Sequence, residues 1–195
     1  MTATTLTSNT VLLLIDIQKG LDDWAYYGGN RNNLDAEPKA AHLLGFWRKK
    51  SWPIIHVKHS STHLDSPLHP SNPGHAIKAE VAPLANEPVI DKNVNSAFIG
   101  TDLEARLRAA GQHQLVIVGL TTNHCISTSV RMGANLGFEV LLVADATATF
   151  DRKNHLGVSY DAETVHQTAL ASLHNEFATV VTTDQLLLLA DAVSE

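Results

Sequence analysis

Short runs of apolar residues alternate with stretches of helical periodicity along almost the whole chain. The first run, 10–15 (TVLLLI), is apolar from its second residue onward. Strands of this kind are buried on both faces, as in parallel sheets. The segment 35–50 instead carries Leu43, Leu44 and Trp47 at helical spacing. This alternation predicts right-handed crossovers and a parallel sheet covered by helices on both faces.

Six strands and five helices are expected. The predicted strands are 10–15, 53–57, 88–90, 115–118, 140–143 and 178–181. The predicted helices are 35–50, 101–110, 125–136, 161–175 and 183–190. Thr101 and Glu104 have the spacing of a capping box at the start of the second helix. We therefore predict a three-layer α/β/α fold with a Rossmann-like six-stranded sheet, in a single domain spanning 1–195.

Composition excludes several classes of partner. Fourteen basic against twenty acidic residues give a net charge of −6, which argues against nucleic acid and anionic membranes. No run of apolar residues is long enough to span a bilayer. The N-terminal residues MTATTLTSNT lack the basic start of a secretory signal, and one cysteine cannot form an internal disulfide. We expect a cytoplasmic protein.

Three reactive side chains follow predicted strands. Asp16 ends the first strand, Lys92 follows the third, and Cys125 lies beyond the fourth and opens a predicted helix. Ligands of open α/β sheets bind at the carboxyl ends of the strands, so we expect these side chains to converge. Each also has a simpler interpretation: a buried small hydrophobe for the cysteine, a turn residue for the aspartate, and a solvated side chain for the lysine.

If they converge, the three side chains suit nucleophilic catalysis. The amides at a helix start and a nearby lysine favour the thiolate of Cys125 by lowering its pKa. The carboxylate of Asp16 accepts the thiol proton and later returns it to a leaving group. The amides around Cys125 hold an oxyanion.

Three longer segments carry a resemblance. VLLLIDIQKG, IDKNVNSAFIGTDLEARL and VIVGLTTNHCISTSVRMGANLGFEVLLVADATATF resemble the isochorismatase-like cysteine hydrolase superfamily over about 11–188. The resemblance implies that fold, with Asp16 as catalytic aspartate, Lys92 as catalytic lysine and Cys125 as nucleophile. It also implies a cis peptide between Leu120 and Thr121, which aims the Thr121 amide inward to form an oxyanion hole with the Cys125 amide. A homo-oligomer, dimer or tetramer, is expected on the same ground.

The pattern departs from the nicotinamidases of that superfamily, which carry an Asp-x-His metal site after the second strand. Here His59 and Ser61 stand at the corresponding positions. The spacing of His59, His63, His69 and His75 in a proline-rich loop matches no compact ligand signature. GLTTNH lacks the glycine pattern of dinucleotide-binding turns. We therefore expect no metal and no cofactor.

Candidates for the substrate pocket are mostly aromatic. Gln18 follows Asp16 and is expected to orient it, while Trp24, Tyr26 and Tyr27 lie on the loop after the first strand. Phe98 and Phe150 follow Lys92 and the DATAT segment, and Phe150 could also reach a neighbouring subunit. These aromatic residues could equally pack the loop or a subunit contact. His124 is given no catalytic role, because on a helix it points away from Cys125.

The leading hypothesis is an isochorismatase-family hydrolase that cleaves a C–N bond in a small amide or ureido/carbamoyl compound through a thioester. One alternative is hydrolysis of an isochorismate-type vinyl ether, with Asp16 as acid and Cys125 as bystander. Another is a catalytically vestigial oligomeric scaffold. The presence of Cys125 favours the first hypothesis, and the intact set of aspartate, lysine and cysteine argues against the last.

Overall fold

A computed structural model of the chain describes residues 5–193. The first four residues of the segment assessed for a secretory signal lie outside this range. The main strands are β1 (Val11–Ile15), β2 (Ile54–His59), β3 (Val89–Lys92), β4 (Gln114–Leu120), β5 (Glu139–Ala148) and β8 (Thr179–Val181). The longer helices are α2 (Ala36–Lys50), α3 (Leu103–Ala109), α4 (Ser127–Asn135), α5 (Ala162–Leu173) and α6 (Thr183–Asp191).

Six strands form one parallel sheet in the order β3-β2-β1-β4-β5-β8. From β1 the chain first builds outward through β2 to β3, and then returns to the other side of β1 to add β4, β5 and β8. The strand order therefore reverses between β1 and β4. In doubly wound sheets this reversal point opens the crevice in which ligands bind.

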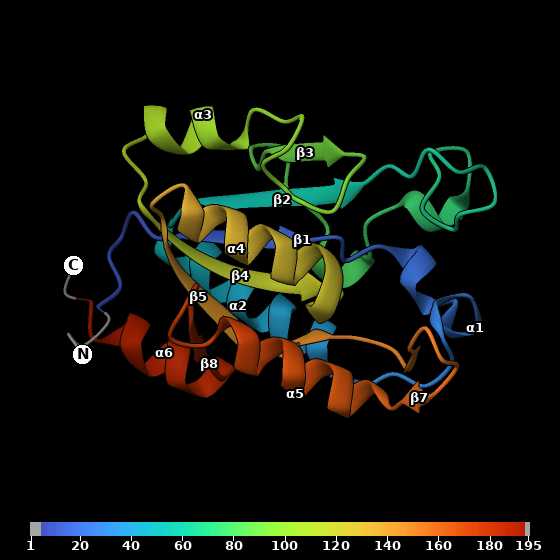
Figure 1. Ribbon diagram of the computed structural model, residues 1–195. Helices are drawn as coiled ribbons and strands as arrows, with labels where there is room; N and C mark the ends of the chain where they lie inside the picture. The colour runs from blue at the N-terminus through green and yellow to red at the C-terminus, as the bar shows by residue number, and fades with distance from the viewer. Residues whose placement is uncertain (1–4, 194–195) are drawn as a thin grey trace.

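Helices cover both faces of the sheet, as Figure 1 shows for α4 and α5 on one side and α2 on the other. Leu13 of β1 lies in the same apolar cluster as Leu107 of α3 and Val130 of α4. Leu14 instead joins the opposite cluster, with Trp47 of α2. Because successive residues of β1 point to opposite faces and both faces are covered, the whole strand is buried. The predicted three-layer α/β/α fold with six parallel strands is confirmed.

Gly119 lets β1 and β4 approach closely at the reversal point. Its φ is 128°, and a Cβ atom built there would lie 1.9 Å from the carbonyl oxygen of Ile15. Only glycine fits such a position without moving the backbone. The contact lies one residue before Asp16, so it fixes the distance between the end of β1 and the segment that carries Cys125.

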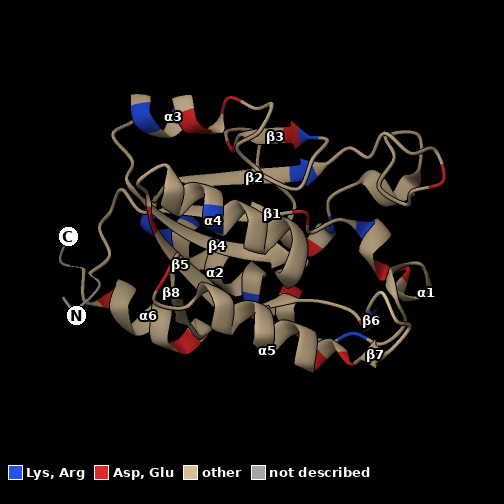
Figure 2. Cartoon of the chain, in the orientation of Figure 1, with Lys and Arg blue, Asp and Glu red and all other residues tan. Residues whose placement is uncertain are grey.

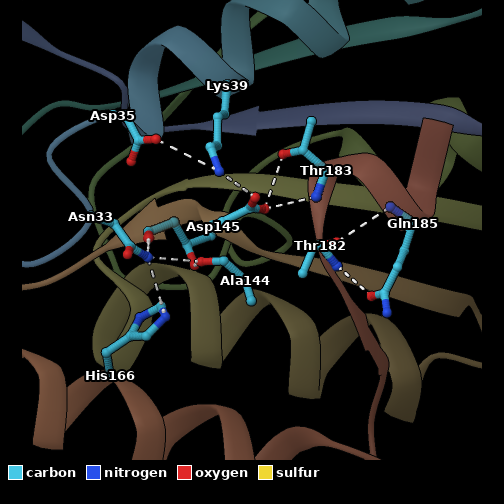
Figure 3. Close-up of polar contacts among 10 residues, drawn as sticks. Asn33, Asp35, Lys39, Ala144, Asp145, His166, Thr182, Thr183 and Gln185 are labelled. Carbon is cyan, nitrogen blue, oxygen red and sulfur yellow. Dashed lines mark hydrogen bonds and ion pairs between the residues drawn. The ribbon is translucent and has the colours of Figure 1, made fainter.

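A bulge interrupts β5 opposite Ile117 and Gly119 of β4. Figure 3 shows the polar contacts around it: the amide of Asn33 donates to the carbonyl oxygens of Ala144 and Thr147, at 3.1 and 2.8 Å. Asp145 accepts a bond from Lys39 of α2 at 2.6 Å and bonds from the backbone and hydroxyl of Thr183 at the start of α6. These hydrogen bonds pair the polar groups that the bulge leaves out of the sheet, and they connect β5 to α2 and α6.

Several local predictions need correction. Asp102, not Thr101, is the N-cap of α3, and no capping box forms there, because Glu104 pairs with Arg108 instead. The capping box of this chain is at α6, between Thr182 and Gln185.

The segment 125–136 does not begin as an α-helix. A π-helical turn, η4 (Thr122–Ile126), precedes α4, so Cys125 lies within that turn. Sequence periodicity also missed a hairpin of β6 (Arg152–Lys153) and β7 (Ser159–Tyr160), and the short helix α1 (Trp24–Tyr27). Shorter 3₁₀ turns are η1 (Lys19–Asp22), η2 (Pro73–His75) and η3 (Ala79–Val81). Within residues 5–193, no helix has the length and apolar character needed to cross a bilayer.

Candidate active site

The structure brings Asp16, Lys92 and Cys125 together at the carboxyl edge of the sheet. The Nζ atom of Lys92 lies 2.6 Å from Oδ2 of Asp16 and 3.4 Å from Sγ of Cys125. Figure 2 shows charged segments at the carboxyl ends of β1, β2 and β3. Parallel strands end at the same edge, which explains why residues more than a hundred positions apart in sequence meet there.

Asp16 sits in a special backbone conformation at the end of β1. Its φ of 55° places it in the left-handed region, where aspartate is tolerated better than most residues. The side chain is buried, and its Oδ2 accepts a hydrogen bond from Lys92. The other carboxylate oxygen, Oδ1, is buried with no hydrogen-bond partner among the described residues. This oxygen is therefore available to accept a proton.

His59 is a member of the site that sequence reasoning did not place there. It ends β2 in register with Lys92 of β3, and its Nδ1 lies 3.1 Å from the lysine Nζ. Burial lowers the pKa of His59, and the lysine charge lowers it further. The ring is therefore neutral at pH 7 and accepts a hydrogen bond from the ammonium. The position of His59 at the end of the second strand is the sequence feature that could have predicted its place in the site.

The thiol of Cys125 differs from the expectation of a stabilised thiolate. Burial raises its pKa well above the ordinary value of 9.0, the Asp16 carboxylate raises it further, and Lys92 opposes both without offsetting them. The resting sulfur is therefore protonated. The prediction failed because it counted the helix start and the lysine but not the loss of solvent or the neighbouring carboxylate.

The peptide bond between Leu120 and Thr121 is cis, as the resemblance implied. Thr121 is buried, and both Thr121 and Cys125 line the same cavity.

That cavity has a volume of about 520 Å³ and is lined by Asp16 and Cys125, whereas Lys92 is buried and does not line it. Its walls come from the β1–α1 segment, the His-rich loop, the η4 turn and the β6 hairpin. The lining residues are Asp16, Leu21, Tyr26, Tyr27, His59, Ser66, Leu68, Asn95, Leu120, Thr121, His124, Cys125 and Arg152.

Of the expected pocket residues, Tyr26 and Tyr27 line this cavity, and four others do not. Trp24 is exposed on α1. Phe98 is buried against Phe138 in the apolar core under α3 and α4. Phe150 is fully buried and stacks behind Tyr27 at a centroid distance of 5.3 Å. Phe98 and Phe150 were misplaced because sequence proximity to a strand end does not show which way a ring points.

Gln18 connects segments rather than orienting the Asp16 carboxylate. Its side-chain nitrogen donates to the carbonyl oxygens of His59 and His75, and its oxygen accepts from the His59 amide at 2.7 Å. The side chain is fully buried. Gln18 therefore fixes the end of β2, and with it His59, next to the loop that follows β1.

One cluster could in principle hold a metal ion. Ligand atoms of Asp16, His59 and Cys125 lie within 4.8 Å of one another, and no other such group of three occurs in residues 5–193. The ammonium of Lys92 makes its contacts to these same three side chains. A cation bound there would meet the charge of Lys92 and a protonated thiol, so the donor set does not favour a divalent metal. The other histidines of the loop 59–75 form no such group within the described chain.

Comparison with known proteins identifies the family of this chain. The isochorismatase domain model matches residues 10–185. The isochorismatase family protein YrdC of Bacillus subtilis is 47% identical over 176 residues, covering 90% of this chain and 93% of that protein. The chain belongs to the isochorismatase family. The crystal structure of an isochorismatase-family hydrolase from Chromobacterium violaceum superposes with a TM-score of 0.91 at 42% identity, covering 96% and 98% of the two chains.

A third relative of this isochorismatase-family chain is more distant. The ureidoacrylate amidohydrolase RutB of Serratia proteamaculans is 38% identical over 68 residues, which cover 35% of this chain and 27% of that protein. The isochorismatase family consists of hydrolases, so the chain is an isochorismatase-family hydrolase.

Two further residues of this isochorismatase-family site were missed. Arg152 lines the cavity from the β6 hairpin, and its Nη2 lies 3.1 Å from Nδ1 of His124. Burial lowers the pKa of His124, and the arginine charge lowers it further, so the ring is neutral. His124 faces the cavity although it was expected to point away. Its π-helical turn rotates side chains differently from the α-helix assumed.

Proposed function

We propose that this hydrolase cleaves a C–N bond in a small amide or ureido/carbamoyl compound through a thioester on Cys125. The main support is the position of the Lys92 ammonium, within hydrogen-bonding distance of both the Asp16 carboxylate and the Cys125 sulfur. A neutral thiol beside a buried carboxylate that has one free oxygen is a nucleophile next to its base. The name of the relative RutB, an amidohydrolase of ureidoacrylate, agrees with this bond type.

In the first half-reaction, Oδ1 of Asp16 takes the proton of the Cys125 thiol as the sulfur attacks the substrate carbonyl carbon. The developing oxyanion accepts hydrogen bonds from the backbone amides of Thr121 and Cys125. The C–N bond then breaks, and Asp16 passes its proton to the departing nitrogen. An acyl group remains on sulfur as a thioester, and ammonia or an amine leaves.

In the second half-reaction, Asp16 removes a proton from a water molecule as that water attacks the thioester carbonyl. The C–S bond breaks, the acid product forms, and the sulfur regains a proton from Asp16. Lys92 holds Oδ2 of Asp16 in place and stabilises negative charge on whichever of sulfur and carboxylate carries it. His59 positions Lys92 through its hydrogen bond.

The first test is Cys125→Ala, assayed for ammonia release over a panel of amides, ureido compounds and isochorismate. We expect turnover of the C–N substrate to fall by at least about a thousandfold, as for other nucleophile removals. Acid quenching of the wild type should trap an adduct on Cys125 that is visible by mass spectrometry. Circular dichroism of the variant checks its fold.

Two other hypotheses predict different results. Full activity in Cys125→Ala together with complete loss in Asp16→Asn would indicate vinyl ether hydrolysis, with Asp16 as the acid. No turnover of any compound by the wild type, and no adduct, would indicate a vestigial site. Either pattern contradicts the thioester mechanism.

We also propose a homo-oligomer, dimer or tetramer, located in the cytoplasm and binding neither nucleic acid nor membranes. Exposed apolar side chains, including Leu64, Leu156 and Val158, support self-association. The free cysteine supports a reducing compartment. Size-exclusion chromatography with light scattering would measure the molar mass of the assembly and so the number of subunits.

A further inference from the structure

In the described part of the chain, most of the buried polar atoms that have no hydrogen-bond partner belong to residues that line the cavity. Among residues 5–193, four buried side-chain atoms have no hydrogen-bond partner: Asp16 Oδ1, Tyr27 Oη, Arg31 Nε and Arg152 Nε. Three of the four belong to side chains that line the catalytic cavity. Buried polar groups in folded proteins are nearly always paired, and an unpaired one costs about 1–3 kcal/mol. Their concentration at one cavity points to a ligand that pairs with them.

The three atoms differ in what they offer. The proposed mechanism uses Asp16 Oδ1 as a proton acceptor. Tyr27 and Arg152 offer hydrogen-bond donors, one from a neutral hydroxyl and one from a guanidinium. Burial raises the pKa of the Tyr27 hydroxyl, so it remains a donor through neutral pH. The ligand must therefore present acceptor atoms to this part of the cavity.

Arg152 is a cation without an anionic partner. No carboxylate of the described residues forms an ion pair with it, and its one side-chain contact is to His124, a neutral ring. The Asp16 carboxylate of the same cavity is already paired with Lys92. The buried cation Arg31 differs, because it forms an ion pair with Glu37. A planar guanidinium left unpaired in a cavity suits a carboxylate, which it can bind through two parallel hydrogen bonds.

Tyr27 and Arg152 come from two segments that are held together. Gly28 lies so close to Asp151 that a Cβ atom there would be 2.2 Å from the Asp151 carbonyl oxygen. The ring of Tyr27 stacks on the buried ring of Phe150, two residues before Arg152. Both residues also line a second hollow, together with Gly28 and Asp151. The two donors therefore come from α1 and the β6 hairpin, two segments that pack against each other and both line the cavity.

We propose that Tyr27 and Arg152 bind a carboxylate of the substrate, so that the compound hydrolysed is a small carboxylic acid bearing the amide or ureido group. The scissile carbonyl lies at Cys125 and the carboxylate lies at the Arg152 end. This assignment of ends rests on the proposed function. His124 acts as a positioning residue, because its ring nitrogen accepts from the Arg152 guanidinium without neutralising it.

Binding can be measured separately from turnover. The probes are N-carbamoyl amino acids of increasing chain length, each paired with its uncharged amide, titrated calorimetrically into Cys125→Ala. We expect at least one acid to bind about tenfold or more tightly than its amide, the size of a charge-assisted hydrogen bond. Adding Arg152→Gln should remove this preference, and adding Tyr27→Phe should reduce it by about threefold to tenfold. Arg152→Lys should retain part of it.

Lys153→Gln is the matched control, because it removes an equal charge from an exposed neighbour on the same hairpin. It should leave the preference for acids unchanged. The proposal is overturned if no acid binds more tightly than its amide, or if Arg152→Gln and Lys153→Gln have equal effects. Because the titration uses the alanine variant, its result does not depend on nucleophilic catalysis. Turnover that survives in Cys125→Ala would reject the thioester and leave the carboxylate result standing.

Discussion

At the scale of single residues, the site depends on how one ammonium group is shared. Lys92 contacts a carboxylate, a neutral imidazole and a thiol, while burial and the Asp16 carboxylate keep the pKa of that thiol raised and the sulfur protonated at rest. The two charged neighbours act on the pKa of Cys125 in opposite directions: Asp16 raises it and Lys92 lowers it. Because the two effects are opposite in sign, the reactivity of Cys125 can distinguish them experimentally.

The rate at which iodoacetamide alkylates Cys125 at pH 8 should therefore change in opposite directions in two variants. Asp16→Asn removes the carboxylate that raises the thiol pKa, so labelling should become faster than in the wild type. Lys92→Met removes the opposing cation, so labelling should become slower. Each unit of pKa corresponds to about a tenfold change in the thiolate fraction. Intact-mass spectrometry over time gives the rates, and a change in the same direction in both variants would contradict this electrostatic account.

At the scale of secondary-structure elements, the contact between β1 and β4 places Asp16 and Cys125 close to each other. Gly119 allows this contact, because any side chain there would collide with the backbone of Ile15. Next to β4, strand β5 contains a bulge that Asn33 and Asp145 hold through hydrogen bonds. The chain leaves β5 after this bulge and leads to Phe150 and the β6 hairpin. The edge that carries Asp16 and Cys125 and the proposed carboxylate site are thus built by adjacent strands.

Gly119→Ala should lower the free energy of unfolding by about 2–5 kcal/mol, from overpacking and a strained positive φ. Gly45→Ala is the control, because Gly45 is exposed in the interior of α2 and a Cβ atom there meets nothing within 4 Å. That variant should gain about 0.5–1 kcal/mol. Urea unfolding of both proteins measures the difference, and equal stabilities would show that β1 and β4 can separate without cost.

At the scale of the whole molecule, a buried charge network holds the segments around the cavity to helix α2. Glu37 accepts hydrogen bonds from Arg31 and Lys78, and Lys78 also binds Asp22. Burial alone would raise the pKa of Glu37, but the bonds from Arg31 and Lys78 outweigh it and lower the pKa from 4.5 to about 2. The network connects the loop after β1, the start of α2 and the loop before β3.

This lowered pKa predicts sensitivity to acid. The contribution of Glu37 to stability is fully present above the unfolded pKa of 4.5 and is lost as the pH falls toward 2. It amounts to on the order of 3 kcal/mol. Glu37→Gln should therefore be less stable than the wild type at pH 7, and the difference should shrink between pH 4.5 and 2. Denaturant unfolding at several pH values measures this.

The control is Glu104→Gln, which removes an exposed pair with Arg108 on α3. It should change the free energy of unfolding by less than about 1 kcal/mol. A Glu37→Gln effect that is constant from pH 7 to pH 3 would contradict the role assigned to this carboxylate.

The amino-acid sequence by itself determined the layered fold and the edge at which Asp16, Lys92 and Cys125 meet. The spacing of apolar residues indicates which faces of a strand or helix are buried. The carboxyl ends of parallel strands lie at the same edge of the sheet, whatever the details of side-chain packing. Only the tertiary structure decided the protonation of Cys125, the place of His59, and the presence of Arg152 beside the sequence candidate Tyr27 in one cavity. Charge states depend on desolvation, and the direction of a loop side chain depends on contacts such as those of Gly28 with Asp151. Desolvation and these loop contacts both depend on residues that are far apart in sequence, so a local sequence pattern cannot predict them.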